Sequence, residues 1–328
     1  MPLFSRRSEA SPPRPVLVVS MDGWIDAGMA ASGAVGSLVP SVVPQVVATF
    51  DTDELLDHRA RRPVVEITDG LTTGLTWPAI ELRVGTDRNG AGVAALVGPE
   101  PDFRWKAFSA DVVALARELD VRLAVGLGGF PAPVPHTRAV RLATTGNAPD
   151  MAHRIGFVQG TLEVPAGIQA ALEVAFAEAG IPVIGLWARV PHYVAAMPFP
   201  AASAALIDGL NLVGNLSLDT AQLRTQADAS LRRVDELIAQ SSDHEAMVRQ
   251  LEQRIDAAEG NTLDLAQMPT GDEIASELER YLRTEGGPNP EANETDGGRD
   301  RGGHGGGHGG GPADPDGPPG MGGRPQGL

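Results

Sequence analysis

The stretch that decides the fold is V-L-V-V-S-M-D-G-W-I-D-A-G-M-A-A-S-G-A, from Val16 to Ala34. A short apolar run, Val16–Val19, leads into a polar turn and then into a segment of small residues that favours a helix. A buried strand followed directly by a helix N-terminus is where ligands bind in α/β proteins. The turn carries Asp22, Trp24 and Asp26. Because these acids repel anions, the loop has the position of a phosphate-binding loop without its charge.

Two interpretations of the acidic turn remain open. Asp26 precedes a helix expected to begin at Ala27, so its carboxylate either caps that helix or faces a ligand. Asp22 lies within the turn itself and is the stronger candidate for a ligand contact. The small residues that follow form no GxGxxG fingerprint, which argues against a dinucleotide site.

Strands and helices alternate through residues 15–216, which we interpret as one α/β domain. Further apolar runs typical of strands lie at residues 46–50, 64–67, 80–84, 93–97, 121–127 and 183–187. Helical periodicity is found at residues 105–119, 162–179 and 200–216. This order predicts a mainly parallel sheet flanked by helices. The strands between residues 64 and 97 have no helices between them and are expected to be antiparallel or to extend the sheet.

Three further segments differ in composition from this domain. Residues 217–284 are rich in helix formers and charges, and the break at Ser241-Ser242-Asp243 predicts a helical hairpin followed by a shorter helix near residue 270. This appendage either packs on the domain or serves as an arm for oligomerisation or partner docking. The glycine- and proline-rich residues 285–328 are expected to be disordered, as are residues 1–14.

Charge and cysteine content narrow the functional class. The 328 residues carry a formal net charge of −16, so nucleic acid is not an expected partner. There is no cysteine, which excludes disulfides and thiolate metal sites and favours a reducing cytoplasm. We expect no membrane association, because no apolar run approaches the roughly 20 residues of a membrane helix. We also expect no secretory signal peptide, since no hydrophobic segment follows the basic residues of the N-terminal stretch.

Two later loops carry further candidate site residues. One crosses three prolines and presents His136, Thr137 and Arg138, which form either a site for a small anion or carboxylate or a set of ordinary structural contacts. The other presents His192 and Tyr193 directly after a strand. Together with the acidic turn, these residues predict a candidate ligand pocket at the carboxyl edge of the sheet. No GxSxG, HExxH or paired-carboxylate signature is present, so we assign no catalytic residue, metal or cofactor.

Four segments in the same order resemble the PAC2 family, which is named after the eukaryotic proteasome assembly chaperone 2. The resemblance covers roughly residues 15–282 and is carried by D-G-W-I-D-A-G (22–28), G-L-G-G-F-P-A-P-V-P-H-T-R (126–138), E-V-P-A-G-I-Q-A-A-L (163–172), and L-W-A-R-V-P-H-Y-V (186–194) with F-P-A-A-S-A-A-L (199–206). It implies a fold similar to the phosphorylase/hydrolase-like fold of purine nucleoside phosphorylases. It also implies homo-oligomers, with trimers among actinobacterial members. The single lysine of this chain suits the actinobacterial branch of the family.

Two hypotheses about function follow. The first is a non-enzymatic binding or assembly protein, cytoplasmic and homo-oligomeric, with proteasome subunits as partners. The alternative is a small-molecule-binding protein or a nucleoside phosphorylase/hydrolase-like enzyme with its pocket at the carboxyl edge of the sheet. Fold analogy alone cannot decide between them.

Overall fold

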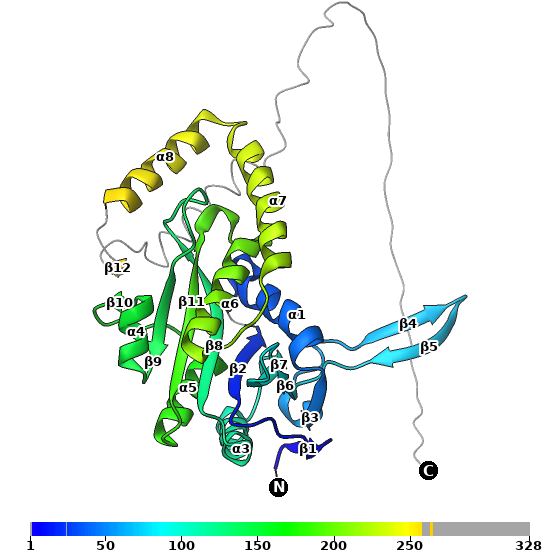
Figure 1. The fold of residues 1–328 in the computed structure, drawn as a ribbon. Coiled ribbons are helices and arrows are strands. Elements are labelled where there is room, and N and C mark those ends of the chain that lie inside the picture. Colours follow the sequence, from blue (N-terminus) through cyan, green and yellow to red (C-terminus); the bar gives the residue numbers. More distant parts are fainter. Residues whose placement is uncertain (1, 24, 258–262, 265–328) are drawn as a thin grey trace, which may run out of the picture. The chain divides into compact units, whose positions relative to one another are not determined.

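An eight-stranded mixed sheet forms the centre of the protein (Figure 1). A computed structural model describes residues 2–23, 25–257 and 263–264. The strand order across the sheet is β1-β3-β6-β7-β2-β8-β11-β9. The bounds of these strands are Phe4–Arg6 (β1), Val16–Asp22 (β2), Gln45–Phe50 (β3), Glu81–Thr86 (β6), Gly92–Pro99 (β7), Leu123–Ala132 (β8), Leu142–Gly146 (β9) and Val183–Pro191 (β11).

The strands in the centre of the sheet are parallel, and the outer strands are antiparallel. Parallel pairing joins β7 to β2, β2 to β8 and β8 to β11. Antiparallel pairing adds β9 at one side and β6, β3 and β1 at the other. The predicted α/β fold with helices flanking a mainly parallel sheet is therefore confirmed. Of the middle strands, β6 and β7 pair antiparallel with each other within this sheet, as expected, whereas the strand at residues 64–67 does not join it.

Helices cover both faces of the sheet. One face packs against α1 and α6, and the other against α3 and α5, with a separate buried apolar cluster on each side. The bounds of the helices are Ala30–Val42 (α1), Thr52–Leu55 (α2), Trp105–Glu118 (α3), Pro149–Ile155 (α4), Ile168–Glu178 (α5), Pro200–Gly214 (α6), Ala221–Ile238 (α7) and Ser242–Ala257 (α8). No helix in the described part of the chain is long and apolar enough to span a membrane.

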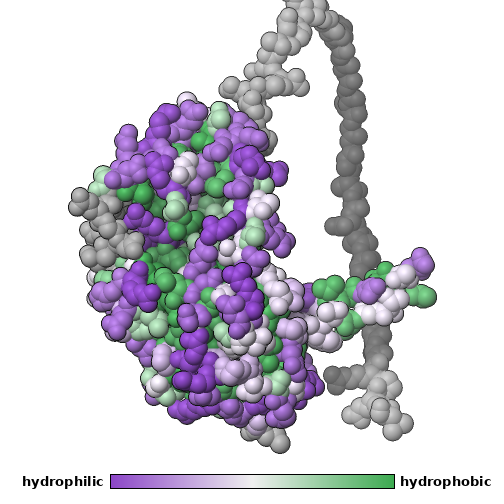
Figure 2. All heavy atoms as spheres, in the orientation of Figure 1, coloured by the Kyte–Doolittle hydropathy of each residue, from purple (hydrophilic) through white to green (hydrophobic). Residues whose placement is uncertain are grey.

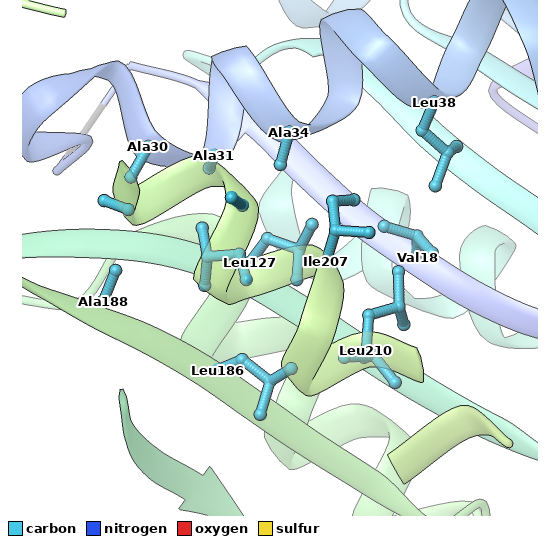
Figure 3. Close-up of a cluster of buried hydrophobic side chains, with 14 of the residues drawn as sticks. Val18, Ala30, Ala31, Ala34, Leu38, Leu127, Leu186, Ala188, Ile207 and Leu210 are labelled. Atoms are coloured by element: carbon cyan, nitrogen blue, oxygen red, sulfur yellow. The ribbon is translucent and has the colours of Figure 1, made fainter. Parts of the chain in front are cut away.

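Small residues let α1 lie close to the sheet and to α6. Ala30, Ala31 and Ala34 of α1 are buried beside Ile207 and Leu210 of α6 (Figure 3). Since alanine adds little bulk, the backbones approach closely, and the larger side chains of the neighbouring elements fill the layer. This is the structural role of the small residues that follow the acidic turn.

The predicted helical hairpin is present as α7 and α8, and its helices meet near residue 240. The short strand β12 (Leu263–Asp264) pairs in parallel with β10 (Val158–Gln159). The shorter helix expected near residue 270 and the disordered tail expected over residues 285–328 lie outside the described residues.

The N-terminal segment differs from its prediction. Within residues 1–14, which we expected to be disordered, Phe4–Arg6 forms β1 and extends the sheet beside β3. Leu3 is buried, and Phe4 packs against Phe50 with ring centroids 5.9 Å apart. Two apolar residues among basic and proline-rich neighbours were too short a signal to predict a strand.

A β-hairpin outside the main sheet projects from the body of the protein (Figure 1). Its strands are β4 (Val64–Thr68) and β5 (Leu71–Thr76). The turn residues Asp69 and Gly70 both have positive φ, 50° and 82°, as in the Asp-Gly turn that favours two-residue hairpins. The apolar run at residues 64–67 is thus a strand, as predicted, but it belongs to a projecting hairpin and not to the core sheet.

Candidate functional site

The loops that carry the candidate site residues meet at the carboxyl edge of the parallel strands. The amide of Gly28 donates to the carbonyl of Ala195 at 2.7 Å, and the amide of Phe199 donates to the carbonyl of Gly28 at 2.8 Å. These bonds join the acidic turn to the loop after β11, and a bridge between Asp26 and Gly129 joins the turn to β8. The sequence therefore placed the loops correctly at one edge of the sheet.

Glycine is required at residue 28 by both backbone conformation and space. Gly28 has φ +66°, and a Cβ atom there would lie 2.9 Å from Cβ of Phe199 and 3.0 Å from Cγ1 of Val190. Met29 also has positive φ, so residues 27–29 form a 3-10 turn and α1 begins at Ala30. The helix start predicted at Ala27 was three residues early, because the chain first turns tightly against the loop after β11.

Asp26 caps α1. Its Oδ1 accepts a hydrogen bond from the amide of Ala31 at 2.7 Å, and its Oδ2 accepts from the amide of Ser32 at 2.9 Å and from the Ser32 hydroxyl. The first amides of a helix have no partner within the helix, so a carboxylate that accepts from two of them stabilises the helix start. The capping interpretation accounts for this residue.

Asp22 lies next to this cap at the end of β2. Its pKa is raised above the ordinary value, mainly by desolvation and also by repulsion from the Asp26 carboxylate. Hydrogen bonding with Ser32 and the charge of Arg61 act in the opposite direction. Trp24, the third candidate in this turn, lies outside the described residues.

His136 is a buried residue that joins two elements. Its backbone amide donates to the hydroxyl of Tyr193 at 2.7 Å, its Nδ1 lies 2.7 Å from the same hydroxyl, and its Nε2 lies 2.9 Å from Oδ1 of Asp235 on α7. The side chain is 2% exposed. Since the Tyr193 hydroxyl accepts from the amide, it can donate its own proton to Nδ1, which leaves Nε2–H to donate to Asp235.

Tyr193 is poorly suited to proton transfer near neutral pH. Burial is the main cause that raises its pKa to about 12, and the charges of Glu252 and Asp235 act in the same direction. Its phenol therefore remains a neutral donor and acceptor at pH 7. His192 is exposed, and its ring meets Tyr193 edge-on with centroids 5.3 Å apart.

Thr137 and Arg138 contact α8. Arg138 forms a two-pronged pair with Asp256, from Nε to Oδ1 at 2.9 Å and from Nη2 to Oδ2 at 2.7 Å, and its Nη1 lies 3.0 Å from Oε1 of Glu252. The Thr137 hydroxyl donates to the same Glu252 oxygen. Hydrogen bonding to Asp256 is the main cause that raises the pKa of Arg138 above its ordinary value, and the same bond lowers the pKa of Asp256.

The candidate residues therefore fall into two groups at the same edge. Asp22 at the end of β2 and Asp26 beside the start of α1 form the first group. The second is the loop over residues 136–138, which contacts the helical hairpin, together with Tyr193, which bonds to His136. The hairpin supplies three acids that sequence reasoning missed: Asp235, Glu252 and Asp256. Glu252 and Asp256 are four residues apart, which puts them on one helix face. No signal in the neighbouring sequence indicates that their cationic partner is Arg138.

This arrangement is suited to docking a helical element. Every polar side chain of the loop over residues 136–138 contacts α7, α8 or Tyr193, so these groups hold elements together. Within residues 2–23, 25–257 and 263–264, no group of three or more histidine and acidic side chains is arranged to hold a metal ion.

Comparison with known proteins identifies the class. The chain matches the PAC2 family over residues 20–238. A solved structure of a PAC2 family protein from Streptomyces avermitilis is 34% identical, with a TM-score of 0.62, and the match covers 71% of this chain and 99% of that chain. A comparison with curated proteins found no match.

Two further solved structures are also similar. One, described as a proteasome-assembly chaperone homologue from Mycobacterium tuberculosis, is 33% identical with a TM-score of 0.66, and the match covers 71% of this chain and 99% of that chain. The other, a protein of unknown function from Corynebacterium glutamicum, is 31% identical with a TM-score of 0.73, and the match covers 78% of this chain and 97% of that chain. The chain belongs to the PAC2 family.

Proposed function

We propose that this PAC2 protein is a non-enzymatic assembly protein of the cytoplasm that self-associates and acts on proteasome subunits. The observation that carries the proposal is the set of contacts that His136, Thr137 and Arg138 make with α7 and α8. These residue types could perform acid–base or anion chemistry, yet here they hold α7 and α8 against the α/β domain. The similar mycobacterial protein described as a proteasome-assembly chaperone homologue supports the choice of partner.

The projecting hairpin supports self-association. Its pairing register places Val65, Ile67 and Leu75 on one face, and these side chains are 47%, 62% and 50% exposed. Figure 2 shows hydrophobic residues along this hairpin. A two-stranded hairpin is only marginally stable in water by itself, and an apolar face on it favours coverage by a partner. A second copy of the chain, forming the homo-oligomer that the family suggests, would cover the hairpin of every molecule.

Light scattering on the full chain tests self-association. We expect the wild type to form a homo-oligomer, with a trimer as the first expectation, and the variant Ile67→Glu/Leu75→Glu to shift towards monomer. The matched control Gln222→Glu/Gln226→Glu adds two charges to exposed positions of α7, away from the hairpin. A monomeric wild type, or equal dissociation of both variants, would reject this part of the proposal.

Co-purification tests the partner. Tagged full-length protein should retain α-subunits of the proteasome from the same cells, and addition of the purified chain should change the yield of assembled rings in a reconstitution. The Ile67→Glu/Leu75→Glu variant serves as a comparison that separates binding from self-association. Absence of α-subunits at micromolar protein, together with unchanged ring yield, would exclude the proteasome as the partner.

A further inference from the structure

The turn that joins α7 to α8 contains no helix-breaking residue. It spans Ala239, Gln240 and Ser241, whose amides donate to carbonyls four, three and three residues earlier in the chain. Residues 217–259 contain neither glycine nor proline. Since glycine and proline are the residues that most strongly oppose a helix, this sequence is compatible both with the observed turn and with an uninterrupted helix over residues 221–257.

The buried faces of α7 and α8 are in one register along the sequence. Residues spaced by seven follow one another through both helices and the turn: Ala227, Val234, Ser241, Val248 and Ile255. Ala227, Val234 and Val248 are buried, and Ile255 is half-buried. A spacing of seven residues returns to nearly the same side of a helix, so an uninterrupted helix would carry all five side chains on one face.

Leu237, two residues before the turn, fits the same pattern. It is 46% exposed, although it lies fourteen residues from Leu223 and fourteen from Leu251, both of which are buried. On an uninterrupted helix these three leucines would also share one side, beside the first apolar row. Joining the two helices would therefore extend one apolar stripe past the turn and include an apolar side chain that is now exposed.

The surface that holds α8 belongs to the α/β domain. We call it the α8-binding surface: the polar contacts are with Thr137 and Arg138 of the loop after β8, and Ile255 of α8 lies in a small hollow beside them. From the turn, α7 and α8 diverge (Figure 1). Every copy of the chain has the same surface, so a copy can receive α8 from its own chain or from another.

We propose that α8 is exchanged between copies of this chain. Residues 239–241 become helical, α7 and α8 join, and α8 occupies the α8-binding surface of a second copy. The contacts of α8 are then formed again between the two chains, including the pair of Arg138 with Asp256 and the pairing of β12 with β10, and only the turn changes. This exchange goes beyond the proposed function, because it requires neither the projecting hairpin nor a proteasome subunit.

An engineered cysteine pair tests the exchange in the full chain, which has no cysteine of its own. Thr137→Cys/Glu252→Cys puts one thiol on the loop and one on α8, at side chains that are hydrogen-bonded, and keeps the two-pronged contact of Arg138 with Asp256. A short bismaleimide should link the pair between chains, seen as covalent oligomers on a denaturing gel, in a fraction that rises with protein concentration.

A matched pair corrects for random collisions between molecules. Thr137→Cys/Gln250→Cys has its second thiol at an exposed position of α8 and should give few links between chains. If Thr137→Cys/Glu252→Cys gives no more links between chains than this control at any concentration, α8 stays on its own chain and the proposal is overturned.

Two variants of the turn test whether the exchange needs an uninterrupted helix. Added to the cysteine pair, Ser241→Ala/Ser242→Ala favours the helix, whereas Ser241→Gly/Ser242→Gly disfavours it. The protein concentration at which half of the links join different chains should be at least about tenfold lower for the alanine variant than for the glycine variant. Equal concentrations would overturn the joining of α7 to α8.

The variant Ile67→Glu/Leu75→Glu separates this exchange from self-association through the projecting hairpin. Links between chains should still form in that background at high protein concentration, because the exchange uses no residue of β4 or β5. If they disappear there at every concentration, α8 is not exchanged independently and the proposal fails. Failure of the exchange alone would leave the light-scattering result for the wild type unchanged, so the two outcomes can be told apart.

Discussion

Two loops at the same edge of the sheet carry polar residues whose hydrogen-bond partners lie at very different separations along the sequence. In the loop after β2, Asp26 bonds to amides five and six residues later. In the loop after β8, His136 and Arg138 bond to acids 99 to 118 residues later. The first loop shapes one helix start, whereas the second attaches a helical hairpin to the domain. Polar residues that look alike in the sequence thus have a local role in one loop and a tertiary role in the other.

The largest effect should come from the long-range loop. His136→Ala removes a buried ring that contacts both Tyr193 and Asp235, and we expect it to lower the free energy of unfolding by about 2–3 kcal/mol. Urea denaturation followed by circular dichroism measures this loss. His192→Ala is the matched control, because that histidine is exposed, and it should change stability by less than about 0.5 kcal/mol. Equal effects of the two variants would show that burial of His136 contributes nothing particular.

The local loop should give the next effect. Asp26→Ala removes the acceptor for two helix amides and should lower the free energy of unfolding by about 1–2 kcal/mol in the same assay. Asp26→Asn retains an oxygen acceptor and should recover much of the loss. If the alanine variant is as stable as the wild type, water replaces the carboxylate at the start of α1, and the contrast between the loops is greater than we infer.

The same contrast explains what the sequence could predict. The strands of the core, the parallel centre and the cap at Asp26 follow from periodicity and from signals within a few residues. The partners of His136 and Arg138 depend on how α7 and α8 pack, and one sequence does not specify such distant pairs. The Asp69-Gly70 turn is also a local signal, and it would have paired the strand at residues 64–67 with the residues that follow it in a hairpin.

Arg138 offers a smaller test of the long-range loop. The pair between Arg138 and Asp256 is partly exposed, at 38% and 54%, so Arg138→Gln should leave the denaturation midpoint nearly unchanged. Amide hydrogen exchange in α8 should nevertheless become faster, since this helix loses its charged contacts with the loop. Arg249→Gln, which removes a pair within α8, is the control. Unchanged exchange across α8 would mean that the buried Val248 and Leu251 hold the helix without help from Arg138.

Asp22 gives the smallest effect, and its sign depends on pH. Its pKa is raised in the folded protein, so the protonated form is favoured there, and the resulting stability is lost as pH rises from the ordinary pKa of about 3.9 through the raised value. At pH 7 Asp22→Asn should therefore stabilise the protein, by no more than about 0.5 kcal/mol because solvent screens the exposed carboxylate.

The same substitution separates the two influences that act on Asp22. Near pH 3 the carboxyl of the wild type is largely protonated, so its stability should approach that of the asparagine variant. Urea denaturation of both proteins at pH 3 and pH 7 measures the difference. If Asp22→Asn is less stable than the wild type at pH 7, attraction between Asp22 and Arg61 outweighs desolvation and repulsion from Asp26. The acidic turn would then also take part in longer-range contacts, and the distinction between the two loops would be one of degree.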